Sequence, residues 1–290
     1  MAASIGPDYA SIDGNATPDI AAGKRAGARF MIPRAIYGRP ADGQAPVYVD
    51  PVWKRDKDRI AVNGLKKTAY LFLCFPRKGL ITPEPEVQAD AFADYVQLVA
   101  YKDYVPMLDV EEKSDILNDE EMVAWTLRAA KRLRKRYGVW PGIYTAWHDC
   151  LNTGVPVGAL INCPLWIAKP WPVAINQPVH LDGMPAYPPI LIKPWGNQWF
   201  FYQYQGDATG WPGFTSTVDA NRFRVFGPGA KGDHVKWVQQ RCGGLVIDGD
   251  FGPKTTAAVK TLQAQYGLTP DAYVGPDTFA PLGWSNPAPE

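Results

Sequence analysis

A candidate catalytic pair, Asp109 and Glu111, directly follows the apolar run at residues 104–108. Side chains two residues apart on a strand point the same way, so Asp109 and Glu111 share one face and Val110 points to the other. Two carboxyls brought close together repel, so one of them tends to keep its proton at neutral pH. Such a pair supplies the proton donor and the carboxylate that cleavage of a glycosidic bond requires.

Glu111 is the expected proton donor of this pair. Repulsion from Asp109 and partial burial at the mouth of a barrel would both favour its protonated form. A structural alternative stays open, because Glu112, Asp115 and further acids follow, and the pair could simply begin an acidic loop. A D-x-E pattern is short, and spacing alone supports the two interpretations about equally.

Two further acids, Asp8 and Asp219, lie near the two ends of the strand-rich region. Asp8 lies in the first apolar segment, residues 6–11, and Asp219 follows the apolar end of a late strand candidate at residues 217–218. The first and last strands adjoin in a closed barrel, which would bring both carboxyls to its mouth. Each of them alone could equally be a turn or cap residue.

The elements that must position these acids alternate along the chain between short apolar runs and amphipathic stretches. Asn118 or Asp119 can cap the clearest helix, and Gly138 ends it. Pro33 lies inside a predicted strand, which indicates an edge or a bulge. Strands are predicted at residues 29–37, 69–75, 105–110, 142–147, 164–168, 199–204 and 217–218, and helices at 50–62, 84–101 and 118–137.

This alternation over roughly 225 residues predicts an α/β fold, an irregular (β/α) barrel. The irregularity is expected in the second half, because residues 170–196 are rich in proline and show no helical periodicity. An internal repeat follows, in which DGDFGPKT at 248–255 is echoed by DAYVGPDT at 271–278. We therefore predict a barrel at residues 1–226, and at 227–290 a linker with a small all-α domain of a size that can fold alone.

Composition and charge exclude several classes of partner and cofactor. The net charge of +1 gives no general attraction to nucleic acid, and no apolar run reaches the roughly 18 residues of a membrane helix. The N-terminus has no basic segment followed by an apolar one, so we expect no secretory signal peptide. The four cysteines form no C-x-x-C pair and the three histidines no H-x-H or H-x-x-x-H pair, so no metal or other cofactor is expected.

A series of segments then occurs in a familiar order. It runs Gly6-x-Asp8, FMIPRAIYG (30–38), AYLFL (69–73), PMLDVE (106–111), GIYTAW (142–147), PLWIA (164–168) and YQYQGDATGWPGFTSTVDANRF (202–223). In this order the segments resemble glycoside hydrolase family 25, the Chalaropsis-type lysozymes, which are N-acetylmuramidases. The resemblance covers residues 5–226 and implies an irregular (β/α) barrel without a cofactor.

The resemblance also implies roles for individual residues. Glu111 matches the general acid, Asp109 its D-x-E partner, and Asp8 and Asp219 two supporting acids. It further implies retention of configuration, with the acetamido group of the substrate attacking and Asp109 orienting it. Four other positions match residues that line the sugar groove of the family, although core packing explains them equally well: Tyr70, Tyr144, Trp166 and Gln203.

The sequence departs from the family pattern in places. Tyr9 and Ala10 follow Asp8, where the family usually has D-x-S, and no histidine follows Tyr70. These departures bear on the sugar subsites more than on the chemistry.

Residues 229–284 look like the common helical peptidoglycan-binding module, with Ala272 replacing the usual glycine of the second copy. A cutting domain joined to a wall-binding domain, without a signal peptide, is similar to bacteriophage endolysins, which leave the cytoplasm through a holin pore. We therefore expect a monomeric lysozyme that hydrolyses the β-1,4 bond between N-acetylmuramic acid and N-acetylglucosamine in bacterial peptidoglycan. Neither a nucleic acid partner nor stable membrane association is expected.

Other wall-directed activities remain as alternatives. A zinc amidase or peptidase would need clustered ligands, which the sequence does not offer. A cysteine peptidase could pair Cys150 with His148 or His180, but the residues around Cys150 resemble no nucleophile site. A non-catalytic wall-binding protein is the third alternative, and the intact D-x-E pair argues against it.

Overall fold

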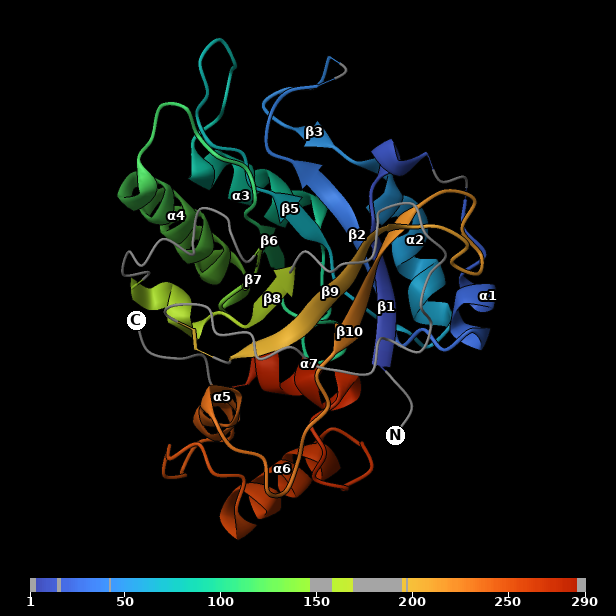
Figure 1. Cartoon of the computed structure of the whole chain (residues 1–290), viewed down its shortest axis with the longest axis vertical. Coiled ribbons are helices and arrows are strands. Elements are labelled where there is room, and N and C mark those ends of the chain that lie inside the picture. Colours follow the sequence, from blue (N-terminus) through green and yellow to red (C-terminus); the bar gives the residue numbers. More distant parts are fainter. Residues whose placement is uncertain are drawn as a thin grey trace.

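The computed structural model describes residues 4–14, 17–41, 43–146, 158–168, 195–196 and 198–285. Eight strands form a closed barrel, and three helices follow it at the C-terminal end of the chain (Figure 1). None of the helices in these ranges is long and apolar enough to cross a membrane.

The barrel strands follow each other around the ring in the order β1-β10-β9-β8-β7-β6-β5-β2, and pairing of β1 with β2 closes it. They are β1 (Ser4–Tyr9), β2 (Phe30–Tyr37), β5 (Tyr70–Phe72), β6 (Met107–Asp109), β7 (Gly142–Ala146), β8 (Leu165–Ala168), β9 (Trp199–Ala208) and β10 (Val218–Phe223). Two short strands, β3 (Tyr48–Val49) and β4 (Lys66–Lys67), pair with β2 outside this ring. The predicted barrel is confirmed.

Strand β10 breaks the parallel order, because it runs antiparallel to both β9 and β1. Its first residues therefore lie at the edge where the parallel strands end, and Asp219 pairs in register with Asp8. The prediction that Asp219 follows the end of a strand is thus wrong in detail. Asp219 reaches the predicted mouth from the beginning of an antiparallel strand.

Helices cover the outside of the barrel, and their ends follow local sequence signals. Their bounds are α1 (Ile20–Arg25), α2 (Pro51–Val62), α3 (Pro85–Tyr95) and α4 (Asp119–Tyr137), with short 3-10 turns at Ser11–Asp13 and Gly158–Asn162. In α4, Asn118 and Glu121 cap each other's backbone N–H, and Gly138 ends the helix at φ 77°. The predicted caps are confirmed. Helix α3 ends at Tyr95, six residues before the predicted 101.

Pro33 lies in a strand with partners on both sides, since β2 pairs with β1 and β5. The edge alternative is therefore wrong. The bulge alternative fits better, because the register of β2 with β5 shifts between Arg34 and Ile36. A proline removes one ladder donor, and an irregularity of this kind accommodates the loss.

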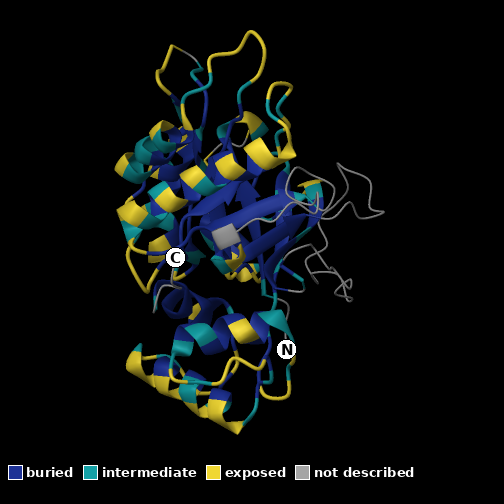
Figure 2. Cartoon of the chain, turned by 90° about the vertical axis from the view of Figure 1, so that its left-hand side faces the viewer, coloured by how far each residue is buried: buried dark blue, intermediate teal, exposed yellow. Residues whose placement is uncertain are grey.

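The C-terminal helices α5 (Asp233–Cys242), α6 (Pro253–Gln265) and α7 (Pro276–Trp284) share an apolar core with the base of the barrel. Helix α7 lies directly beneath the strands (Figure 1), and residues on both sides of the junction are buried (Figure 2). The ring of Phe279 lies 5.0 Å from that of Phe200 and 5.6 Å from that of Trp237. The buried Trp284 donates its indole N–H to the carbonyl of Asp103 at 2.8 Å.

The internal repeat is visible as two matching sets of hydrogen bonds. Gln239 in α5 donates to Asp248 at 2.7 Å, and Gln263 in α6 donates to Asp271 at 2.8 Å. Each glutamine also accepts from the next backbone N–H of its turn, that of Gly249 or Ala272. The domain boundary at residue 226 stays a prediction. The shared core nevertheless gives the C-terminal helices a partner that the sequence did not reveal.

Candidate active site

The side chains predicted from the sequence converge on one cavity of about 200 Å³ at the mouth of the barrel. Each predicted site residue lines it: Asp8, Tyr70, Asp109, Glu111, Tyr144, Trp166, Gln203 and Asp219. Ala10, Ile12, Asp13, Arg34 and Phe72 complete the lining. All eight strands of the barrel contribute to this lining, so the closed barrel is what brings these distant residues together.

The D-x-E stretch points as the alternation predicts, although β6 already ends at Asp109. Asp109 and Glu111 both line the cavity, whereas Val110 is fully buried in the core outside it. The N–H of Val110 donates to the carbonyl of Tyr144 at 2.9 Å, which extends the β6–β7 ladder by one residue. This bond fixes the backbone from which Glu111 projects.

The acid that follows the pair has a structural role. Glu112 accepts from both terminal nitrogens of Arg39, each at 2.6 Å, and from the N–H of Phe75 at 3.0 Å. These bonds tie the loops after β2, β5 and β6 together beside the cavity. The acidic-loop interpretation therefore applies to Glu112, while Asp109 and Glu111 are left to face the cavity.

A hydrogen-bond chain links the acids on the other side of the cavity. Tyr144 donates its hydroxyl to Gln203 Oε1 at 2.9 Å. Gln203 Nε2 in turn donates to Asp219 Oδ2 at 2.9 Å and to Asp8 Oδ2 at 3.3 Å. Asp219 Oδ1 accepts from the N–H of Asp207 at 2.7 Å. Gln203 thus bridges the two supporting acids from the middle of the site.

Asn221 belongs to this network and was missed from the sequence. Its Nδ2 donates to Asp8 Oδ2 at 2.6 Å, and its Oδ1 accepts from the indole N–H of Trp166 at 2.7 Å. The indole bond fixes which end of the amide faces Asp8, because only the carbonyl end can accept it. Asn221 lies two residues after Asp219, and this same-face spacing was the available signal.

The aromatic side chains form the floor of the cavity. Trp166 is fully buried, and its ring lies 4.6 Å from that of Tyr144 and 6.3 Å from that of Tyr70. Tyr70 and Tyr144 are also buried, and burial raises the pKa of both phenols well above their ordinary value. Both phenols therefore stay protonated, and that of Tyr144 serves as a neutral hydrogen-bond donor.

Burial dominates the electrostatics of the acids. It raises the pKa of Asp8, with repulsion from Asp219 as the next cause, and it raises the pKa of Asp219 to about 7. Burial also raises the pKa of Asp109 well above its ordinary value, followed by repulsion from Glu111 and Asp8. The expected partial burial of Glu111 is wrong, since this side chain is exposed. Asp109 carries the burial that was expected for its partner.

Asp109 also has an unsatisfied atom. Its Oδ1 is buried and has no hydrogen-bond partner among the described residues. A buried acceptor without a donor costs about 1–3 kcal/mol of stability. The position therefore suits a donor supplied by a bound molecule.

Metal or thiol chemistry has little support within the described ranges. No group of His, Cys, Asp and Glu there has the arrangement of a metal site. His234 is buried beside the ring of Phe226, and burial lowers its pKa to about 3. Cys150, His148 and His180, which the cysteine peptidase alternative needs, lie outside the described residues.

A closed (β/α) barrel with a carboxyl pair and supporting acids at its mouth has the architecture of a glycoside hydrolase. The chain belongs to glycosyl hydrolases family 25, because the sequence model of that family matches residues 32–211, which are more than half of the chain. The sequence model of a second family, "putative peptidoglycan binding domain", matches residues 231–282. Asp8 and Asp219 lie outside both matched ranges, and the geometry of the cavity is what connects them to the site.

Solved structures share the fold of the barrel. A lysozyme from Streptomyces coelicolor is 22% identical with a TM-score of 0.58, over 77% of this chain and 93% of the other. A muramidase from Trichobolus zukalii is 23% identical with a TM-score of 0.55, over 77% and 94%. The spore cortex lytic enzyme SleM of Clostridium perfringens is 22% identical with a TM-score of 0.56, over 77% and 67%.

The curated relatives match a smaller part of the chain. A zinc D-Ala-D-Ala carboxypeptidase from Streptomyces albus G is 45% identical over 58 residues, which are 18% of this chain and 23% of that protein. An uncharacterized protein from Kitasatospora aureofaciens is 52% identical over 40 residues, which are 14% and 34%. The chain thus spans about a quarter to a third of the length of these relatives.

Proposed function

We propose that this protein is an N-acetylmuramidase that hydrolyses the β-1,4 bond between N-acetylmuramic acid and N-acetylglucosamine in bacterial peptidoglycan. The observation that carries the proposal is the convergence of Asp109 and Glu111 with Asp8 and Asp219 in one cavity at the barrel mouth. Membership of family 25 and the match to a peptidoglycan binding domain support the same polymer as substrate.

Glu111 is the proton donor in this proposal. It is the exposed member of the D-x-E pair, so its carboxyl can reach the glycosidic oxygen of a glycan strand lying across the mouth. A bound strand displaces water, and removal of water favours the neutral form of a carboxyl. Glu111 then protonates the leaving oxygen as the glycosidic bond breaks.

Asp109 orients the group that attacks. Its unpaired Oδ1 would accept the N–H of the substrate's acetamido group, which turns the acetamido oxygen towards the anomeric carbon. That oxygen forms a bond to the anomeric carbon as the leaving group departs. Water then opens the resulting ring while the Glu111 carboxylate takes its proton, and the product keeps the original configuration. This mechanism is one of the exceptions to a carboxylate nucleophile.

Burial raises the pKa of both Asp8 and Asp219, so this pair keeps one proton between them near neutral pH, and the remaining carboxylate supplies negative potential beneath the developing positive charge. Their shared donor Gln203 and the donor Asn221 hold both carboxyls in place. Charge held in fixed positions stabilises an oxocarbenium-like transition state without reorganisation.

Replacement of Glu111 tests the proposal. Glu111→Gln keeps the shape of the side chain but has no carboxyl proton to donate, so turnover of purified peptidoglycan should fall by roughly 10²-fold or more. Glu120→Gln, on an exposed residue in the first turn of α4, is the matched control and should keep full activity. Near-normal turnover by a folded Glu111→Gln variant would remove Glu111 from this role.

A further inference from the structure

A second cavity, of about 500 Å³, lies where the C-terminal helices meet the base of the barrel. The barrel contributes Lys24 and Arg29, which precede β2 and therefore lie at the end of the barrel opposite the catalytic cavity. The second copy of the repeat contributes Asp271 and Tyr273 from the turn between α6 and α7, and Asp277 from the first turn of α7. The cavity thus exists only where the two parts of the chain meet.

Lys24 and Arg29 have no acidic partner in the part of the chain that the structure describes. Arg29 and Lys24 are both exposed, and neither forms an ion pair with any residue that the structure describes. Lys24 donates to the backbone carbonyl of Asn63, and no hydrogen bond of the Arg29 guanidinium occurs within the described ranges. Both cations remain able to bind carboxylates.

The acidic side of the cavity is also largely available. Asp277 is 74% exposed and forms only a long ion pair with Lys66, at 3.9 Å. Asp271 Oδ1 is occupied by Gln263 and by the N–H of Tyr273, which hold the turn in shape. Asp277 can therefore meet an ammonium group at one end of the cavity.

The second copy of the repeat differs from the first at the position that faces the cavity. In the first copy Asp250 pairs with Lys231 at 2.8 Å, so its charge is neutralised within the module. The corresponding residue of the second copy is Tyr273, which is 41% exposed and packs against Gly227. A Cβ at Gly227 would come within 2.8 Å of the Tyr273 ring, so only glycine leaves room for the ring in this position. The second copy thus presents an aromatic ring at the position where the first copy has the Asp250–Lys231 ion pair.

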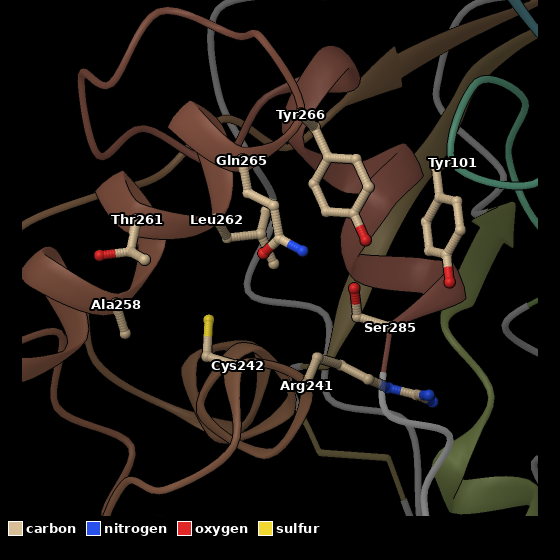
Figure 3. Close-up of a pocket in the computed structure, with 9 residues that line it drawn as sticks. All are labelled: Tyr101, Arg241, Cys242, Ala258, Thr261, Leu262, Gln265, Tyr266 and Ser285. Atoms are coloured by element: carbon tan, nitrogen blue, oxygen red, sulfur yellow. The ribbon is translucent and has the colours of Figure 1, made fainter.

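A neighbouring cavity of about 430 Å³ at the same junction has a different character (Figure 3). Tyr101 of the barrel and Tyr266, the residue after α6, stack there at 4.9 Å, so each ring already covers the other. Its cation, Arg241, donates to the carbonyl of Asn162 at 3.1 Å and lies over the ring of Trp237. Gln265 lines this cavity and provides a control position for the one described above.

We propose that the cavity between the second repeat and the barrel base binds the stem peptide of peptidoglycan, a short peptide with free carboxylates and a diamino acid. Arg29 and Lys24 bind its carboxylates, Asp277 binds its side-chain ammonium, and Tyr273 packs against its aliphatic part. This inference rests on the proposed function, since it names the part of the same polymer that the C-terminal module holds. The catalytic cavity would bind the glycan strand at one end of the barrel, while this cavity holds a peptide at the other.

Binding of a soluble stem tetrapeptide that contains a diamino acid and no sugar tests the inference. Titration calorimetry would use the full-length Glu111→Gln protein, with thermal unfolding of every variant as a check of folding. Arg29→Glu should weaken binding about tenfold or more, which corresponds to about 1.4 kcal/mol. Binding to the parent protein should also weaken with added salt, because exposed charges are screened.

Two controls separate this cavity from its surroundings. Gln265→Ala, in the neighbouring cavity, and Lys254→Glu, at the position of the first repeat that corresponds to Asp277, should both bind the peptide like the parent protein. Unchanged binding by a folded Arg29→Glu variant would overturn the inference, as would an equal loss in the Gln265→Ala variant.

The two proposals fail in different ways. Normal release of reducing ends together with unaffected peptide binding by Arg29→Glu would overturn this inference and leave the proposed function intact. Absence of glycan cleavage with the expected loss of peptide binding in Arg29→Glu would support the peptide site and overturn the proposed activity.

Discussion

Asp219→Asn should change how the stability of the protein depends on pH. Burial raises the pKa of Asp219 from its ordinary 3.8 to about 7 in the folded protein. Between these two pH values the folded state keeps a proton that the unfolded state has lost. The stability linked to this group is therefore fully present below about 3.8 and is lost as the pH rises through about 7.

The size of the effect follows from the pKa. Between pH 5 and pH 8 the loss acts over roughly two pH units up to the folded pKa, and at about 1.4 kcal/mol per unit it amounts to about 3 kcal/mol. The amide of the variant has one acceptor oxygen for the two donors, Gln203 and Asp207, that Asp219 satisfies, and the lost bond costs about 1 kcal/mol at either pH. That cost cancels when the two pH values are compared. Relative to wild type, the variant should thus gain about 3 kcal/mol of stability between pH 5 and pH 8.

Urea unfolding followed by tryptophan fluorescence at pH 5 and pH 8 measures this difference. Asp58→Asn, on a side chain that is 80% exposed on α2, is the control and should shift stability by less than about 0.5 kcal/mol at both pH values. A gain for Asp219→Asn of less than about 0.5 kcal/mol between the two pH values would refute the reasoning, because burial would then not act on this carboxyl.

Three further predictions follow from particular contacts. Asn221→Ala removes a hydrogen-bond donor to Asp8. Because Asn221 acts through Asp8, this variant should lower kcat on purified peptidoglycan by roughly tenfold or more with little change in KM. The longer side chain of Asn221→Gln should not restore the rate. Residues 249 and 272 both have a φ near +70°, a backbone conformation that glycine tolerates best. In thermal unfolding, Gly249→Ala should therefore destabilise the protein by about 1 kcal/mol or more, whereas Ala272→Gly should be neutral or slightly stabilising. Equal effects of the two substitutions on stability would contradict this reasoning. A chain ending at residue 226 should aggregate or lose its cooperative unfolding transition, because removal of α7 exposes Phe200, Phe201 and Phe223. A soluble fragment that unfolds cooperatively would contradict the shared core.

The parts of the site that the sequence predicted rest on short-range patterns. The alternation of Asp109, Val110 and Glu111 needs only local strand geometry, and the caps of α4 need only neighbouring residues. The repeat in the C-terminal region was likewise readable, because matching residues occupy matching hydrogen-bond positions. These features hold in the structure because no distant contact competes with them.

The parts that were missed depend on pairing between distant segments. The antiparallel direction of β10 is set by its pairing with β9 and β1, and no local signal carries it. Asn221 reaches Asp8 across 213 positions of sequence, and Trp166 meets Asn221 across 55. Glu111 is exposed because β6 already ends at Asp109. The apolar run at residues 104–108 did not indicate where the strand would end.

The docking of α7 on the barrel was hidden for a related reason. Phe279 and Trp284 fit the apolar face of an independent helical module as well as they fit a shared core. Only the partner rings of Phe200, Phe201 and Tyr104 distinguish the two. The expectation that residues 229–290 fold alone did not take these partners into account.

Identification of the new chain ends in digested peptidoglycan tests the central claim most directly. Purified walls are treated with the protein, the products are reduced with borohydride, and mass spectrometry identifies the reduced sugar and any new free amino groups. The account predicts new reducing ends made of N-acetylmuramic acid, without new amino groups, and their loss in the Glu111→Gln variant. Reducing ends made of N-acetylglucosamine, or new amino groups without new reducing ends, would contradict it.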